Sequence, residues 1–330
     1  MDEIKGRLLN VSLLADSEAG RAYYGRAGSG LPELTPEAIA AGFPPQPSLN
    51  MTFFGGKTIA DLVFVNHYLG GEDAWDAADI ANIDAALAKA MSDSVLQSVI
   101  AQYYQQTPIS SRMLPSVVLP DLAPATVFKD QVEALAERIF TNGGLGDADP
   151  GSTVVNIMLP RGVVLTDGFS PGFQPPPGAE AEHERRVGVV LKLDDDEDAD
   201  SKHGLGGYHG STHVGGTTVY YAVGVYSERG NGIPAFSQSW KSVVATFYHE
   251  LNEARTDPDV EDANRTGDLS KVGWYANVDH GGEIGDIPIN EAGAHLSLVF
   301  KEIGLADGSG TVPVQLMWSN KDFGPSSNIA

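Results

Sequence analysis

The residues with the clearest chemical potential lie between Trp240 and Pro258, in the stretch WKSVVATFYHELNEARTDP. Apolar residues recur there at spacings of three and four, which is the pattern of one face of an α-helix. On such a helix His249 and Glu253 project together, one turn apart, with Glu250 on their flank. An imidazole and a carboxylate at this spacing can bind one metal ion, while a neighbouring carboxylate accepts a proton.

This spacing resembles the HExxH zinc helix, in which the residues at i and i+4 bind the metal and the glutamate after the first histidine is the general base. Here Glu253 takes the place of the second histidine, and a carboxylate oxygen binds zinc at about the same distance as an imidazole nitrogen. The polar groups are expected on the outer face, opposite the apolar stripe, and a merely solvated acidic face is the alternative. Ser237 or Ser239 is expected to cap the helix, and Asp257 before Pro258 to end it.

A second acidic segment, KVGWYANVDHGGEIGDIPIN, follows the helix and carries Asp279, Glu283 and Asp286. Zinc sites built on such a helix often take a third ligand from a downstream glutamate, and Glu283 fits that position. Asp286 is expected to orient the ligands from outside the first ring. Asp259 competes for the third position, but Pro258 disfavours the turn that it would need.

Histidines also accompany a glycine-rich stretch, HGLGGYHGSTHVGG, which places His209 and His213 on an expected loop before a strand at 217–226. Either histidine is a candidate fourth ligand or a hydrogen-bond donor to a bound oxyanion, and a purely structural loop is the alternative. His280 and Tyr275 are further candidates for polarising a substrate carbonyl.

The composition restricts the class of protein. The chain has 330 residues, 42% of them hydrophobic and 20% charged, which is typical of a folded globular protein. A formal net charge of −23 argues against nucleic acid and anionic membranes as partners and favours divalent cations, although it serves solubility equally well. Because cysteine is absent, disulfides, thiolate ligands and a cysteine nucleophile are excluded. No G-x-S-x-G element follows a strand, so a serine hydrolase is disfavoured.

Neither end of the chain nor its interior contains an apolar run long enough to span a bilayer. The N-terminus places acidic residues before one short apolar patch and does not read as a secretory signal. We therefore expect a cytoplasmic protein from the chain as it stands, and a secreted one if its natural N-terminus is longer. The oligomeric state stays open.

Strand and helix patterns alternate along the chain, which predicts an α/β (mixed α+β) fold. We expect an irregular lead-in over 1–50, then one domain over 51–330 with a Pro-rich and acidic insertion at 166–203. The acidic run at 194–200 lacks the pattern of a calcium loop. His67 is expected at the end of a strand, where it either lines a pocket or is a structural residue. Strands are expected at 51–56, 59–71, 152–160, 187–193 and 217–226, and a final strand followed by a turn within 311–324. Helices are expected at 32–42, 73–90, 92–104, 127–140 (capped by Thr126) and 240–258.

Five segments of the chain resemble the EXORDIUM or phosphate-induced protein family, known best from plant cell walls. They stand in the family's order over most of residues 51–324 and read MTFFGGKTIADLVFVNHYLGG, GGYHGSTH, FYHELNEARTDP, WYANVDHGGEIGD and VQLMWSNKDFG. The family's helix motif typically reads HE, two residues, E, then T-N-P or T-D-P, with an E-I-x-D element downstream. His249, Glu250, Glu253, Glu283 and Asp286 match these positions.

This resemblance implies a zincin-like fold, with a mixed sheet beside a metal-binding active-site helix. The chain departs from the plant members because it lacks their cysteines and signal peptide and carries the insertion at 166–203. These departures argue against carrying over the extracellular location and wall association of the plant members. They do not affect the predicted metal ligands.

The leading hypothesis is a zinc-dependent hydrolase of peptides or other small amides. His249, Glu253 and Glu283 would hold the zinc, and Glu250 would take a proton from the bound water. Since two carboxylates neutralise Zn²⁺, activity is expected to favour neutral to alkaline pH. Calcium or manganese would also suit these ligands. The alternatives are a non-catalytic binding or growth-related protein with a closed metal site, completed by His209 or Asp286, and a protein that binds no metal.

Overall fold

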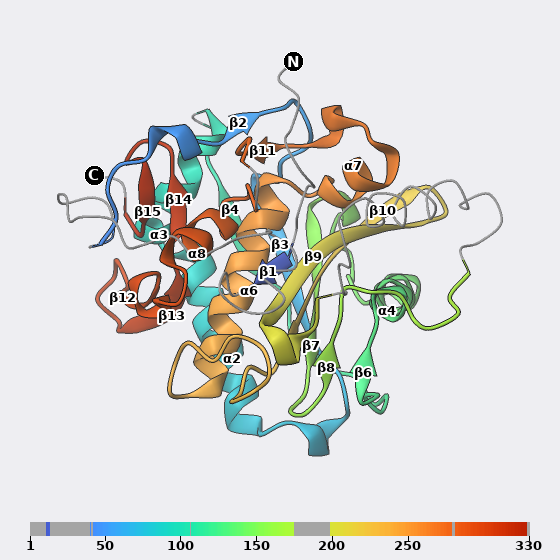
Figure 1. The fold of residues 1–330 in the computed structure, drawn as a ribbon. Helices are drawn as coiled ribbons and strands as arrows, with labels where there is room; N and C mark the ends of the chain where they lie inside the picture. Colours follow the sequence, from blue (N-terminus) through green and yellow to red (C-terminus); the bar gives the residue numbers. More distant parts are fainter. Residues whose placement is uncertain are drawn as a thin grey trace.

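A seven-stranded mixed sheet forms the centre of the protein in the computed structural model, which describes residues 11–13, 40, 42–105, 107–174, 199–278 and 281–328 (Figure 1). Strands β10, β7 and β3 are parallel, β4 and β5 pair in parallel with β3, and β9 and β1 complete the other edge in antiparallel pairing. In spatial order the strands are β1 (Val11–Leu13), β9 (Leu205–Val214), β10 (Thr217–Val225), β7 (Thr153–Leu159), β3 (Asp61–Tyr68) and β4 (Ser110–Met113), with β5 (Val117–Val118) beside β3.

Helices pack on both faces of this sheet (Figure 1). One face is covered by α2 (Ala77–Ser92), α3 (Ser94–Ala101) and α6 (Ser239–Thr256), and the other by α4 (Lys129–Thr141). Successive strand residues alternate between the faces: Phe64 faces α6, whereas Val65 faces α4. Two shorter helices, α7 (Val260–Thr266) and α8 (Asp286–Ala292), follow α6 in the chain. The mixed α/β architecture and the mixed sheet predicted from the sequence are confirmed.

Short elements connect these layers. Four two-stranded pairs are β2 (Thr52–Phe53) with β11 (Trp274–Tyr275), β6 (Thr126–Val127) with β8 (Val164–Leu165), β12 (Phe300–Gly304) with β13 (Thr311–Gln315), and β14 (Met317–Ser319) with β15 (Gly324–Ser326). Single 3-10 turns are η1 (Pro47–Leu49), η2 (Glu72–Ala74), η3 (Gln102–Tyr104), η4 (Pro150–Ser152), η5 (Ser201–His203), η6 (Leu269–Lys271) and η7 (Leu296–Leu298).

Helix α6 is buried on every side from Ser242 to Thr256, because β9, β10, β13 and α2 all pack around it. Its close approach to β10 requires a glycine: a Cβ added at Gly224 would lie 3.0 Å from the ring of Phe247. The sequence predicted this helix, but its polar face was wrongly expected to be the outer one. The amphipathic pattern identified one buried face and could not reveal that other elements cover the second.

The predicted start of two helices was wrong. Thr126 belongs to β6 and does not cap α4, which begins after Phe128, whose N–H is bound by the side chain of Gln131. Helix α6 has Gln238 at its N-cap, without a side-chain cap from Ser237 or Ser239. Instead Ser242, inside the helix, accepts a hydrogen bond from the N–H of Phe236 at 3.1 Å. In both places tertiary contacts replace the local cap that the sequence suggested.

Two other predicted elements differ in extent. The helix expected at 92–104 ends at Ala101 and continues as η3, which Gln105 closes with a φ of 45°. The final strand expected within 311–324 is divided into β13 and β14, and Phe323, with a φ of 61°, lies in the turn that follows, before β15. The predicted strand at 187–193 and most of the predicted helix at 32–42 lie outside the described residues.

None of the helices in the described ranges is both long enough and apolar enough to cross a bilayer.

Removal of the Phe247 ring is expected to lower the free energy of unfolding by about 3–5 kcal/mol, because Phe247→Ala leaves a cavity between α6 and β10. Urea unfolding followed by circular dichroism would measure the change. Leu122→Ala is the matched control, since Leu122 is 89% exposed and should change the free energy by less than about 0.5 kcal/mol. Equal effects of the two substitutions would contradict the packing described here.

Candidate metal centre

His249, Glu250 and Glu253 lie in the middle of α6 and are completely buried, each with 0% exposure. Strand β9 brings His209 to them, the segment before α8 brings Glu283, and the first residue of α8 is Asp286. The predicted ligands His249, Glu253, Glu283 and Asp286 therefore lie in one buried cluster with Glu250 and His209.

The first group of converging atoms consists of His249, Glu253 and Asp286. Their ligand atoms all lie within 4.8 Å of one another, with His249 Nε2 3.0 Å from Glu253 Oε2 and 3.7 Å from Asp286 Oδ1. Asp286, predicted as an orienting group or as a fourth ligand, therefore converges with His249 and Glu253. One imidazole and two carboxylates form a ligand set that zinc accepts.

Gln315 in β13 fixes the ring of His249. Its Nε2 donates to the Gly285 carbonyl at 2.6 Å, so its Oε1 faces His249 Nδ1 at 2.8 Å. An amide oxygen only accepts, and therefore Nδ1 carries a hydrogen and Nε2 points into the group of acids. Metal-binding histidines commonly have such a partner on the second ring nitrogen. The close packing also needs Gly285, where an added Cβ would lie 2.4 Å from Nδ1.

A second group of converging atoms consists of His209, Glu250 and Glu253, whose ligand atoms also lie within 4.8 Å of one another. His209 Nδ1 lies 3.4 Å from Glu250 Oε2 and 3.6 Å from Glu253 Oε2, while its Nε2 lies 3.6 Å from Glu283 Oε1. Glu283, predicted as the third ligand, thus faces His209 rather than His249. The sequence placed His209 on a loop, which was wrong: it lies in β9, which pairs with β10 from Gly207 to Val214.

The acids of the cluster raise one another's proton affinity. Burial raises the pKa of Glu250 to about 7 and the pKa of Asp257 to about 8. Burial, together with the charge of Glu253, holds the pKa of Glu283 and of Asp286 well above its usual range. Carboxyl groups in this state would be neutral in part at pH 7 unless a cation shared the site.

The imidazoles and Glu253 shift in the opposite sense. Burial alone would lower the pKa of both histidines, but nearby glutamates, Glu250 and Glu253, raise the pKa of His209 and of His249 to about 10. Burial alone would also raise the pKa of Glu253, but the charge of His249 and the contact with His209 lower it to about 2. Glu253 is therefore the carboxylate that stays ionised at the centre of the cluster.

The cluster fits a divalent cation because several of its buried polar atoms have no hydrogen-bond partner. These atoms are His249 Nε2, Glu250 Oε1, Glu253 Oε2, both carboxylate oxygens of Glu283 and both of Asp286. A buried polar atom without a partner is costly, and native proteins seldom leave so many together. Coordination to a cation would satisfy these atoms.

Three other residues were predicted to take part in the site. Two of them belong to neither group of ligand atoms, and the third lies outside the described residues. Asp259, the competing third ligand, accepts a hydrogen bond from Tyr220 at 2.8 Å and belongs to neither group of ligand atoms. Tyr275 is buried in β11 with its ring against Gly282, next to the segment that carries Glu283. His280 lies outside the described residues.

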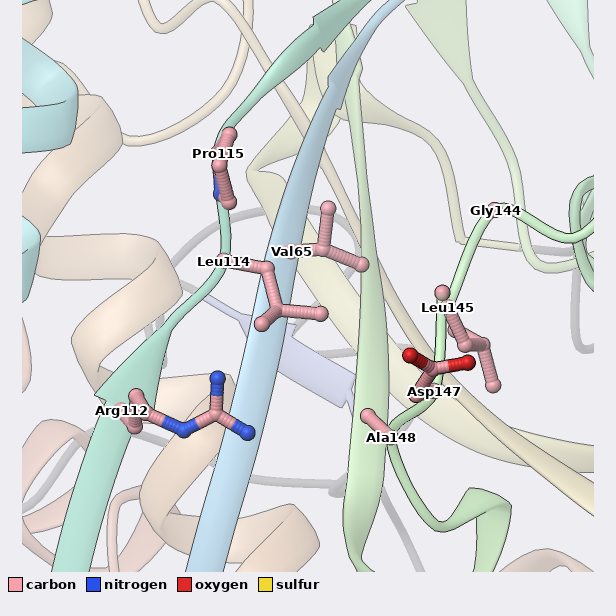
Figure 2. Close-up of a pocket in the computed structure, with 9 residues that line it drawn as sticks. Val65, Arg112, Leu114, Pro115, Gly144, Leu145, Asp147 and Ala148 are labelled. Carbon is pink, nitrogen blue, oxygen red and sulfur yellow. The ribbon is translucent and has the colours of Figure 1, made fainter.

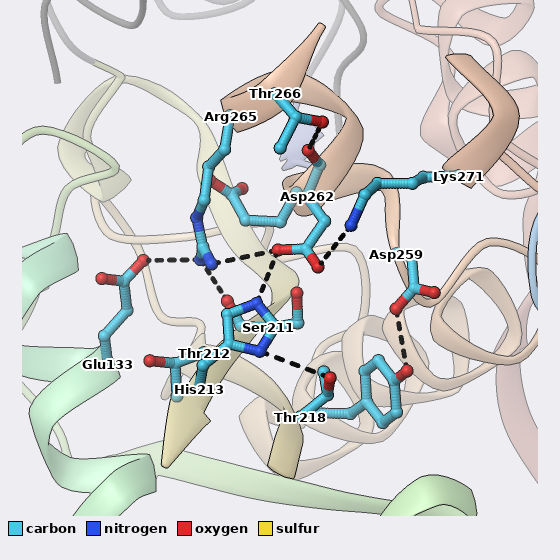
Figure 3. A network of polar contacts seen from close by, with 12 residues as sticks. Glu133, Ser211, Thr212, His213, Thr218, Asp259, Asp262, Arg265, Thr266 and Lys271 are labelled. Atoms are coloured by element: carbon cyan, nitrogen blue, oxygen red, sulfur yellow. Dashed lines mark hydrogen bonds and ion pairs between the residues drawn. The ribbon is translucent and has the colours of Figure 1, made fainter. Parts of the chain in front are cut away.

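His213, predicted as a possible ligand, instead belongs to a network of ion pairs that holds β9 (Figure 3). Its Nε2 lies 2.9 Å from Asp262 Oδ1, and Asp262 also pairs with Arg265 at 3.2 Å. Arg265 reaches Glu133 of α4 at 3.4 Å and donates to the carbonyl of Ser211 in β9. The network connects α4, α7 and β9, and Arg265 contacts β9 at Ser211, two residues after His209.

A separate surface pocket of about 400 Å³ lies on the sheet face that carries α4 (Figure 2). Val65, Leu114 and Leu145 line it, with Arg112 and Asp147 at its sides. None of its lining residues belongs to the buried cluster. His67 lies near it, beside Gly144, and burial lowers the pKa of His67 to about 4, which is typical of a structural histidine.

Comparison of the chain with protein family models, with curated proteins and with solved structures finds no match. The resemblance to the EXORDIUM family stays a prediction.

The sequence did not predict that two further residues belong to the centre. Gln315 lies 66 positions after His249, in a segment read only as a terminal strand. Asp257, read only as the end of the helix, is buried, and its backbone carbonyl lies 3.4 Å from His209 Nε2. The one available signal for Gln315 was the need of a metal-binding histidine for a partner on its other ring nitrogen.

The chelator-treated protein is expected to become less stable as the pH rises from about 5 to about 9. Glu250, Asp257, His209 and His249 all have a raised pKa in the folded state, so the folded protein binds more protons than the unfolded chain over this range. The stabilising contribution of each group is complete at pH values below its pKa in the unfolded chain. It is lost as the pH rises through the pKa of the group in the folded protein. Glu253, with its lowered pKa, stays ionised throughout and contributes no slope.

Thermal unfolding at a series of pH values, with chelator and with added zinc, would measure this dependence. Zinc should raise the melting temperature most at the alkaline end. A chelator-treated protein whose melting temperature rises with pH would contradict the assignment.

Proposed function

We propose that the protein is a zinc-dependent hydrolase of amide bonds, in peptides or smaller amides, with a zincin-like active-site helix. The observation that carries the proposal is the convergence of His249 Nε2, Glu253 Oε2 and Asp286 Oδ1, all buried and all without a hydrogen-bond partner. The motif resemblance supports the zincin-like assignment. The ligand set differs from that expected from the sequence, because Asp286 takes the position first given to Glu283.

A zinc ion bound by these three residues would lower the pKa of a coordinated water and polarise a carbonyl oxygen. Manganese or calcium would find suitable oxygen ligands here too, but the imidazole of His249 favours zinc.

Glu250 is the proposed proton acceptor. Its Oε1 has no hydrogen-bond partner, while its Oε2 faces His209 Nδ1 at 3.4 Å. Burial raises the pKa of Glu250 to about 7, and a general base works best when its pKa lies near the working pH. His209 orients the carboxylate and, when protonated, places positive charge beside it. The roles predicted for Tyr275 and His280 in polarising the carbonyl stay predictions.

The second candidate function is a closed, structural metal site in a non-catalytic binding protein. Complete burial favours it, since His249, Glu250 and Glu253 each have 0% exposure, whereas catalytic zinc keeps a position open to water or substrate. In either case the net charge of −23 supports partners other than nucleic acid and anionic membranes.

Metal content tests the ligand assignment. Protein purified without chelator or affinity metal should contain zinc, and His249→Ala should lose about one zinc ion per chain because it removes the only nitrogen ligand of the first group. Elemental mass spectrometry measures both. His295→Ala is the control, since His295 lies outside both groups of ligand atoms. A wild-type protein that binds no divalent cation, even after zinc is added, would refute the proposal.

Glu250→Gln separates the catalytic from the structural function. The substitution keeps the shape of the side chain but removes the proton acceptor, so amide hydrolysis should fall by at least about 100-fold. The zinc held by His249 should stay bound. Turnover of a peptide library, read by mass spectrometry, is the measurement, with exposed Glu72→Gln as the control. Activity that survives in Glu250→Gln would remove Glu250 from the mechanism, and a wild-type protein that binds zinc without cleaving any library member would favour the structural site.

A further inference from the structure

Two groups of potential ligands meet at one carboxylate. His249, Glu253 and Asp286 form the first group, and His209, Glu250 and Glu253 form the second. Only Glu253 belongs to both. The two imidazoles come from different layers of the fold, since His249 lies in α6 and His209 in β9.

The orientation of Glu253 is fixed by the backbone. Its Oε1 accepts hydrogen bonds from the N–H groups of Gly285 and Asp286, each at 3.1 Å. Its Oε2 therefore points between the imidazoles, 3.0 Å from His249 Nε2 and 3.6 Å from His209 Nδ1, and has no hydrogen-bond partner. An ionised carboxylate oxygen between two imidazole nitrogens is placed to bridge two cations.

Charge balance points the same way. The cluster buries five carboxyl groups, those of Glu250, Glu253, Asp257, Glu283 and Asp286, around two imidazoles. Within the described part of the chain, no lysine or arginine forms an ion pair with these carboxylates. If all five are ionised, one divalent cation neutralises two of the charges, and an unpaired buried charge is costly.

We propose that the centre is dinuclear, with a second divalent cation held by His209, Glu250 and Glu253, and with Glu253 bridging the two cations. The inference deepens the proposed function and rests on it, because the second cation shares its bridging ligand with the first. Glu250 would bind through Oε2, the oxygen that faces His209, and Oε1 stays available as the proton acceptor. The substrate class is unchanged.

Stoichiometry tests the second site directly. Wild-type protein, stripped with chelator and dialysed against zinc, should bind about two zinc ions per chain, and His209→Ala and His249→Ala about one each. His213→Ala is the matched control, because His213 lies on the same strand as His209 but pairs with Asp262 outside the cluster. It should keep both zinc ions. Circular dichroism would show whether each variant is folded.

Manganese provides a measurement on the unaltered chain. Two Mn²⁺ ions bridged by Glu253 should give the broadened, exchange-coupled electron paramagnetic resonance signal of a spin pair, which the loss of His209 would convert to that of a single ion. One zinc ion in the wild type, unchanged in His209→Ala, together with an uncoupled manganese signal, would overturn the dinuclear centre and leave the proposed hydrolase standing. Absence of any bound cation would refute both.

Discussion

The charge of Glu253, buried in the middle of α6, is the constraint around which this protein is built. Two backbone amides before α8 hold one of its oxygens, and two imidazoles from α6 and β9 lie against the other. A buried carboxylate is tolerated only where such partners surround it. The elements that supply them must therefore stay in register with one another, and this requirement links the sheet, the central helix and the C-terminal strands.

The surrounding structure stiffens each of these partners. Gln315 binds the ring of His249, and the close packing at Gly285 restricts the position of that ring. The ion pair of Arg265 with Asp262 and the hydrogen bond from Arg265 to Ser211 hold β9 in place beyond His209. The positions of the proposed ligands are thus set by the protein itself. Such preorganisation lowers the cost of binding, because little side-chain freedom is left to lose.

The sequence was sufficient for those features that depend on local pattern. The apolar spacing from Trp240 onwards identified α6, and the spacing of His249 and Glu253 predicted that their side chains converge on one turn. It was not sufficient for features that depend on which elements meet. The burial of the polar side of α6, the exchange of positions between Glu283 and Asp286, and the contact of Gln315 with His249 all arise from segments that the chain brings together over long separations. Glycine-rich HGLGGYHGSTH resembles a loop by composition, yet glycines are needed in β9 because α6 and β10 press against it, as at Gly207.

The contribution of Gln315 also has a consequence for biosynthesis. The residues of the centre extend from His209 to Gln315, so the last of them becomes available only after α6 and α8 have been made. A nascent chain that has completed α6 exposes its acids without the strand that orients His249. The order of synthesis therefore delays the complete centre until β13 has been made, and a product truncated before β13 would carry the HExxE helix without the partner of His249.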